Sequence, residues 1–117
     1  GLGDVYKRHA KAMGQVDIGQ TVVIKDKMVM AVEAIEGTDR CIERGGKIAK
    51  KGAVVVKTAK PSQDTRFDVP AFGLATLKTM KKHHASVIAV EAGKTIIVDQ
   101  QKAIEFADAN NIVVMAI

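Results

Sequence analysis

The sequence has little of several residue types on which proteins rely for stability or binding. Its 117 residues include one cysteine, no tryptophan, one tyrosine and three phenylalanines. Cys41 therefore has no partner for an internal disulfide, and a reducing compartment fits this composition. The aromatic residues are too few for the stacking platform that single-stranded nucleic acids require. No apolar run approaches the roughly 18 residues that span a membrane, and residues 1–30 show no signal-peptide pattern.

The residues that are present are typical of one globular domain. Hydrophobic residues make up 47% of the sequence and charged residues 26%, which excludes disorder. A length of 117 residues leaves room for a single domain. The sequence starts at Gly1 rather than at Met, so we expect it to be a piece of a longer protein.

The net charge of +5 favours anionic partners such as phosphates or acidic lipid surfaces. The basic residues are nevertheless scattered, with Lys50-Lys51 and Lys81-Lys82 as pairs rather than a stripe. We therefore expect no nucleic-acid partner. A basic RNA-associated protein is the alternative, and it would bind many sequences in a salt-sensitive way.

Apolar patterning predicts helices and strands that alternate along the chain. The predicted helices span about 4–13, 38–46, 70–82 and 99–110, and the predicted strands span 20–24, 28–33, 53–57, 85–90, 95–98 and 112–116. The first two strands form a hairpin, and strand 28–33 is apolar on both faces, which predicts cover on both sides. The chain is thus expected to be a single α/β domain with a mixed sheet and about four helices.

Helix ends are predicted from capping residues. Asp4 and Asp99 are candidate N-caps, and the pair Gly45-Gly46 is a candidate helix end. Pro70 would stand in the first turn of the third helix.

Residues 33–40 form the first candidate site. Glu33, Glu36 and Asp39 fall within seven residues at a strand end that leads into a helix. Ligands of α/β folds gather at such strand ends, beside helix N-termini that favour anions. The alternative is that Thr38 or Asp39 only caps the helix.

Residues 60–70 form the second candidate site. This irregular stretch contains Lys60, Arg66, Asp64 and Asp68. Both signs of charge suit a phosphate and its Mg²⁺, because carboxylates bind the cation and basic side chains neutralise phosphoryl oxygens. The alternatives are that Asp68 caps the following helix and that Asp64 is an exposed turn residue.

Other patterns predict no site. Gly93-Lys94-Thr95 is similar to the end of a P-loop, but Ile88 stands where that motif requires glycine. His83 and His84 are adjacent on a helix and point about 100° apart, so they do not share a metal. No zinc-ligand spacing and no Ser-His-Asp arrangement is present.

Four segments in order resemble one family over essentially the whole chain. They are residues 17–20 (DIGQ), 33–39 (EAIEGTD), 60–70 (KPSQDTRFDVP) and 91–95 (EAGKT). This order resembles the C-terminal half of the LpxI family, the UDP-2,3-diacylglucosamine pyrophosphatases of lipid A biosynthesis. The resemblance implies that the family's N-terminal domain is missing from this chain.

The resemblance implies a Mg²⁺-dependent hydrolase that splits a UDP-linked diacylated glucosamine into UMP and the acylated sugar phosphate. It implies Asp64 as the essential catalytic acid with Asp68 second, and Asp64, Asp39 and Glu36 as metal ligands. The implied substrate contacts are Lys60, Gln63, Arg66, Thr38, Gln20 and Glu91.

The resemblance also implies partners and a location. The partners are the family's own N-terminal domain, a second copy in a homodimer, and the surface of the inner membrane. The location is the cytoplasm, at the face of that membrane. Because the substrate would lie between two domains, we expect the isolated chain to be weakly active or inactive. The alternative function is a binding module that recognises a phospholipid or nucleotide without chemistry.

Overall fold

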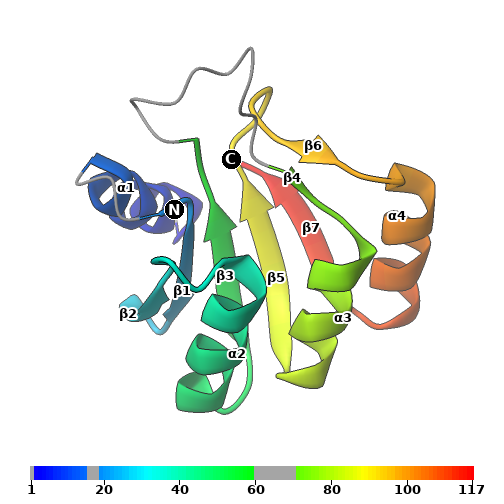
Figure 1. Cartoon of the computed structure of the whole chain (residues 1–117), viewed down its shortest axis with the longest axis horizontal. Coiled ribbons are helices and arrows are strands. Elements are labelled where there is room, and N and C mark those ends of the chain that lie inside the picture. Colours follow the sequence, from blue (N-terminus) through cyan, green and yellow to red (C-terminus); the bar gives the residue numbers. More distant parts are fainter. Residues whose placement is uncertain (1, 16–18, 60–70) are drawn as a thin grey trace.

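The computed structural model describes residues 2–15, 19–59 and 71–117. Within these ranges the chain forms four helices and two sheets (Figure 1). In chain order the elements are α1 (Leu2–Gln15), β1 (Thr21–Lys25), β2 (Met28–Val32), α2 (Thr38–Ala49), β3 (Ala53–Lys57), β4 (Ala71–Phe72), α3 (Leu74–Lys82), β5 (Ala85–Val90), β6 (Ile96–Ile97), α4 (Gln100–Ala109) and β7 (Val113–Ala116). This interleaving confirms the predicted α/β class.

The larger sheet has five strands in the order β2-β1-β3-β5-β7. β1 is antiparallel to both of its neighbours, whereas β3, β5 and β7 are parallel to one another. β1 and β2 form the predicted hairpin, with Asp26 and Lys27 in its turn at positive φ. The sheet is therefore mixed, as predicted, and β4 and β6 pair separately as a small parallel sheet.

Helices cover both faces of the five-stranded sheet. Helices α2, α3 and α4 pack on one face and α1 packs on the other (Figure 1). Because side chains alternate along a strand, Val23 and Val55 point towards the three-helix face, whereas Val22 and Val56 point towards α1. The alternation decides which polar side chains at the strand ends can meet.

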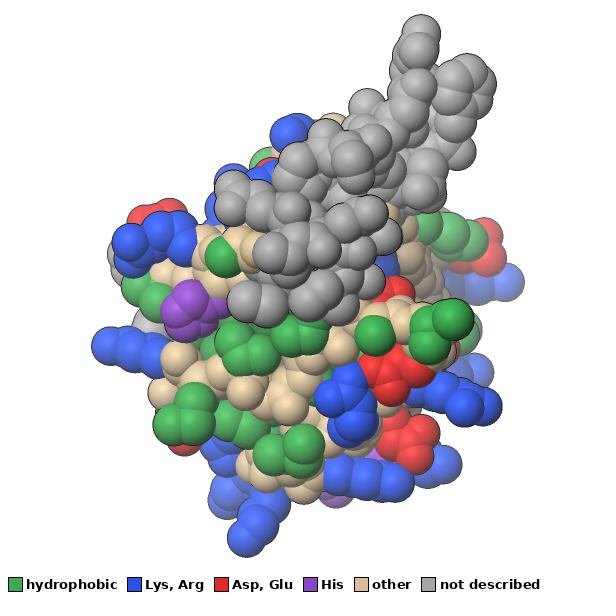
Figure 2. Space-filling view, turned by 60° about the vertical axis from the view of Figure 1, so that its left-hand side comes forward, with side chains coloured by type: hydrophobic (Ala, Val, Ile, Leu, Met, Phe, Trp, Pro, Cys, Tyr) green, Lys and Arg blue, Asp and Glu red, His purple; other side chains and the backbone are tan. Residues whose placement is uncertain are grey.

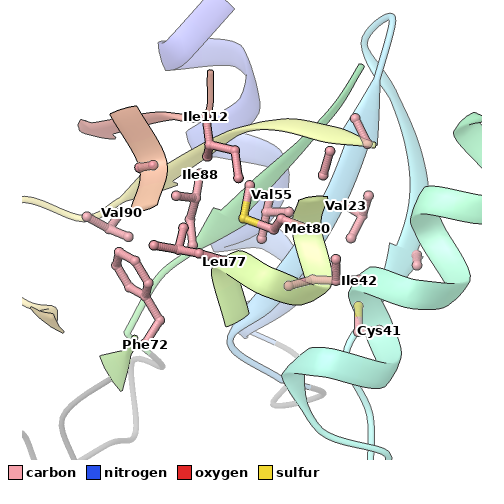
Figure 3. Close-up of a cluster of buried hydrophobic side chains, with 14 of the residues drawn as sticks. Val23, Cys41, Ile42, Val55, Phe72, Leu77, Met80, Ile88, Val90 and Ile112 are labelled. Atoms are coloured by element: carbon pink, nitrogen blue, oxygen red, sulfur yellow. The ribbon is translucent and has the colours of Figure 1, made fainter. Parts of the chain in front are cut away.

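The main core lies between the sheet and the helices α2 and α3 (Figure 3). Ile42 of α2 and Leu77 and Met80 of α3 are fully buried there, together with Val55 and Ile88 of the sheet. Full burial of such a side chain contributes roughly 1.5–3 kcal/mol. This packing holds the two helices firmly against the sheet.

The glycine pair in α2 packs the helix and does not end it. The helix continues to Ala49, so the predicted end at Gly45-Gly46 is wrong. A Cβ at position 45 would lie 2.6 Å from Val23 Cβ, and one at position 46 would lie 2.8 Å from His83 Cβ. Glycine is therefore required because α2 approaches both β1 and the end of α3 closely.

Strand β2 lies at the edge of the sheet, which corrects the prediction that both of its faces are covered. Met28 is 66% exposed and Val29 is also exposed. Figure 2 shows hydrophobic side chains among Lys and Arg on the side of the molecule that carries α1 and β2. An apolar strand sequence does not by itself distinguish an edge position from a central one.

The capping predictions also need correction. Asp4 lies inside the first turn of α1, which begins at Leu2. Asp99 does precede α4, but it adopts a left-handed conformation and makes no side-chain cap hydrogen bond. The N-cap of α2 is Gly37, again without a side-chain bond, so neither Thr38 nor Asp39 is the cap.

Helix α3 begins at Leu74, later than predicted. The preceding pair Ala71-Phe72 is taken up by β4, whose partner is Ile96-Ile97 of β6. Pro70, predicted in the first turn of this helix, lies outside the described residues. A two-residue strand that pairs with a distant segment leaves no local signal in the sequence.

Candidate functional site

The site lies at the edge of the five-stranded sheet that is formed by the ends of its strands, not along the outermost strand β2. The parallel strands β3 and β5 end there with Lys57 and Val90. Because β1 is antiparallel to β3, its first residue, Thr21, is the register partner of Lys57. Glu33 follows β2 at the same edge, where its N–H donates to the carbonyl of Thr21, 2.8 Å away. β1, β3 and the end of β2 thus bring the polar side chains of Thr21, Lys57 and Glu33 to one place, the usual position of ligands in α/β folds.

Half of the predicted site residues lie within the described ranges. They are Gln20, Glu36, Thr38, Asp39 and Glu91. The others lie outside the described residues, and they are Lys60, Gln63, Asp64, Arg66 and Asp68.

A buried lysine connects β1, β3 and α2. Lys57 is 3% exposed and its side chain points to the three-helix face. Its ammonium donates to Thr38 Oγ1 at 3.0 Å and to Thr21 Oγ1 at 3.3 Å. Burial lowers the pKa of Lys57, whereas the charges of Glu33 and Asp39 act in the opposite direction. The ammonium is therefore held in a partly desolvated, polar setting.

The hydroxyl of Thr38 links the ammonium of Lys57 to the carboxylate of Glu33. Thr38 Oγ1 donates to Glu33 Oε1 at 3.3 Å, and the Gln20 backbone N–H donates to Glu33 Oε2 at 3.3 Å. An ammonium can only donate, so the bonds run from Lys57 through Thr38 to Glu33. Thr38 and Gln20, two predicted substrate contacts, thus meet around Glu33.

Asp39 links the beginnings of two helices. Its side chain is exposed, and Asp39 Oδ1 accepts a hydrogen bond of 3.1 Å from Thr76 Oγ1 in the first turn of α3. Its other carboxylate oxygen has no hydrogen bond with any side chain in the described ranges. Asp39 is therefore a predicted metal ligand that keeps one carboxylate oxygen without a side-chain partner in the described ranges.

Glu36 has a different environment. Its carboxylate forms a salt bridge with the guanidinium of Arg44, which also donates to the Val32 carbonyl at 3.0 Å. The hydrogen bond from Arg44 lowers the pKa of Glu36 and outweighs the small effect of burial. Arg44 bonds both Glu36 oxygens, since its Nε also donates to Oε2 at 3.4 Å.

Glu91 lies on the opposite face of the sheet, beside α1. It is 6% exposed, forms a salt bridge of 3.2 Å with Lys11, and accepts a 3.2 Å hydrogen bond from the Ala59 N–H. Burial alone would raise the pKa of Glu91, but the Ala59 N–H and Lys11 outweigh it and lower the pKa. Glu91 therefore anchors both α1 and the chain that leaves β3.

No three His, Cys, Asp or Glu side chains converge on a metal position within residues 2–15, 19–59 and 71–117. Magnesium needs fewer protein ligands than that, because it is commonly held by one or two carboxylates together with substrate phosphates. Asp39 fits this role, whereas Glu36 is already paired with Arg44.

Sequence reasoning missed Lys57 and Thr21 and gave Glu33 no individual role. One signal was available for Lys57. Strand β3 is Val-rich, and Lys57 falls at the inward-facing position two residues after Val55. A charged residue at an inward position needs a polar partner, so this pattern marks a polar cluster.

Comparison with known proteins identifies the family. The model of the LpxI C-terminal domain matches residues 5–115. This chain belongs to the LpxI family. The UDP-2,3-diacylglucosamine pyrophosphatase LpxI of Caulobacter vibrioides is 34% identical to it over an alignment of 116 positions, and the match covers 92% of this chain. The resemblance found in the sequence is thus confirmed.

The chain spans 41% of the length of that LpxI relative. In the helices that the structure describes, no segment combines the length and the hydropathy needed to cross a membrane. The LpxI match includes both candidate segments, 33–40 and 60–70.

Proposed function

We propose that this chain is part of a hydrolase that cleaves the pyrophosphate of UDP-2,3-diacylglucosamine in lipid A biosynthesis. The observation that supports this best is the 34% identity, over 92% of the chain, to a protein named for that activity. The site at the sheet edge agrees with it, because an exposed carboxylate and a buried ammonium lie on adjoining elements there. The products would be UMP and 2,3-diacylglucosamine 1-phosphate.

The proposed reaction is transfer of a phosphoryl group to water. The water oxygen bonds to the β-phosphorus, the bond from that phosphorus to the bridging oxygen breaks, and the bridging oxygen leaves with UMP. Asp64 orients the water and takes its proton, and Asp68 is the second acid. Lys60 and Arg66 hold phosphoryl oxygens, since positioning and charge neutralisation dominate such reactions, and Gln63 is a further substrate contact.

We further propose that the reaction depends on Mg²⁺. Asp39 and Asp64 would hold the ion, while the Arg44 salt bridge makes Glu36 a support for the start of α2 rather than the first choice of ligand. When bound, the cation neutralises phosphoryl oxygens. Thr38 and Gln20 support the site through Glu33, and Glu91 acts from the far face by holding Ala59.

The partners implied by the LpxI resemblance belong to the same proposal. The relative extends well beyond the matched part, which is consistent with a further domain that completes the site. The membrane surface supplies the acylated substrate, and a second copy of the chain forms a homodimer. Activity of the 117-residue chain alone is therefore expected to be low.

The test is release of UMP from UDP-2,3-diacylglucosamine by the full-length protein, with Mg²⁺ and with EDTA. Wild-type protein should release UMP only with the metal. Asp64→Asn should lower kcat by at least about 100-fold, the cost of one missing positioning group. Asp108→Asn, an exposed change on α4, is the matched control and should keep wild-type activity.

A different result would favour the binding module. If the full-length protein binds the UDP-linked lipid but releases no UMP under any metal condition, the proposed reaction is wrong. Wild-type turnover in Asp64→Asn would remove Asp64 from the mechanism and leave the activity in place.

A further inference from the structure

Lys57 is buried more deeply than a lysine in a purely structural position needs to be. It is 3% exposed, at the end of a strand whose other inward side chains are Ala53 and Val55. A charged ammonium loses hydration free energy on burial unless an opposite charge pairs with it. An apolar side chain of the same length would fill this position without that cost.

The two side chains that the structure shows bonded to the ammonium are neutral. Lys57 bonds the hydroxyls of Thr21 and Thr38, and no carboxylate forms a salt bridge with it among the residues that the structure describes. No carboxylate in the described part of the chain therefore cancels the positive charge by direct contact. Charges in a partly desolvated place act on their surroundings more strongly than charges in water.

The hydrogen bonds between Lys57, Thr38 and Glu33 have one order of donor and acceptor. The ammonium donates to Thr38 Oγ1, so the Thr38 hydroxyl must turn its proton elsewhere, and Glu33 Oε1 receives it at 3.3 Å. Thr38 is the first residue of α2, and its neighbour Asp39 bonds Thr76 of α3. The orientation of Thr38 thus bears directly on where Asp39 lies.

We propose that Lys57 is a positioning residue of the hydrolase, which acts through Thr38 to hold the first turn of α2, with Asp39, at the sheet edge. This inference rests on the proposed pyrophosphatase function. Lys57 does not touch the substrate in this role. Its loss should therefore reduce turnover rather than substrate binding.

The test is steady-state kinetics of UMP release by the full-length protein. Lys57→Met keeps the unbranched stem and removes the charge and its donors. We expect kcat to fall about 10- to 100-fold with KM unchanged, as for other positioning groups. Thr38→Val should lower kcat in the same way, and the double variant should be no slower than Lys57→Met, because residues that act through one contact are not additive.

Lys25→Met is the matched control. Lys25 ends β1, is partly buried, and donates to a neutral oxygen, the Ala49 carbonyl at 2.9 Å, but it lies at the opposite edge of the sheet. It should keep the wild-type kcat even where its melting temperature falls. Equal losses of kcat in Lys25→Met and Lys57→Met would indicate general destabilisation and overturn the proposal.

Further outcomes separate this inference from the proposed function. A folded Lys57→Met with wild-type kcat, in an active protein, overturns the inference and leaves the function intact. If Lys57→Met does not fold, Thr38→Val takes its place in the test. A wild-type kcat in Thr38→Val then overturns the inference about Lys57. Absence of UMP release by the wild-type protein overturns both proposals together.

Discussion

Gly45 of α2 lies directly against Val23 of β1, so that a Cβ at position 45 would be only 2.6 Å from Val23 Cβ and 2.7 Å from its Cγ1. Val23 is branched at Cβ and fully buried in β1, which is paired on both sides, so little space is left for its side chain to shift. This contact determines how closely α2 approaches the sheet. A separate contact, with His83 at the end of α3, requires glycine at position 46.

Gly45→Ala is therefore expected to destabilise the protein, although alanine is the better helix former. Overpacking of a tight core costs about 1–3 kcal/mol in the free energy of unfolding. Urea denaturation followed by circular dichroism measures this difference. Gly3→Ala in α1 is the control, because its Cβ would make only an ordinary 3.6 Å contact with Ile117 Cγ2. An unchanged or raised midpoint in Gly45→Ala would contradict the prediction.

Asp39→Asn should weaken the response of the enzyme to Mg²⁺. The amide still accepts the hydrogen bond from Thr76 Oγ1 but no longer supplies a charged ligand. We expect the Mg²⁺ concentration for half-maximal UMP release to rise about tenfold or more, the loss seen when one metal contact is weakened. Asp26→Asn, in the β1–β2 turn, is the control. An identical Mg²⁺ titration in Asp39→Asn would exclude Asp39 as a ligand.

Glu91 should make stability depend on acid pH. Its pKa is lower in the folded protein than in the unfolded chain, so its contribution is fully present above the unfolded value of about 4.5 and is lost as the pH falls through the folded value. Glu91→Gln should lower the free energy of unfolding at pH 7 by about 1–3 kcal/mol. The difference from wild type should shrink below pH 4.5.

Thermal melts of both proteins between pH 7 and pH 3 measure this effect. Glu105→Gln, an exposed change on α4, should stay within about 0.5 kcal/mol of wild type throughout. A difference between wild type and Glu91→Gln that is the same at every pH would show that Glu91 acts through packing and not through its charge.

Cys41 should be unreactive in the folded protein. It is fully buried, and burial raises the pKa of its thiol to about 12, so hardly any thiolate is present at pH 8. Iodoacetamide followed by mass spectrometry should label Cys41 only after denaturation in guanidinium chloride. Labelling of native protein at the rate of a free thiol would contradict this.

Local patterns were enough to predict most of the fold. Short apolar runs identified the strands that became β1, β3 and β5, and the short turn at Asp26 and Lys27 identified the hairpin. Periodicity and turn chemistry act within a few residues, so they survive in the sequence. The errors arose where a distant element decides the outcome, as at the glycine pair of α2 and at β4.

The residues of the site also fall into those that a local pattern predicts and those that only distant contacts bring together. The residues around Glu36, Thr38 and Asp39 were recognised because they follow a strand and begin a helix, a local pattern. Lys57 was not recognised because its partners, Thr21 and Thr38, are 36 and 19 positions away in the chain. Only the antiparallel register of β1 on β3, together with the packing of α2 on that face, places these three side chains within hydrogen-bond distance of one another.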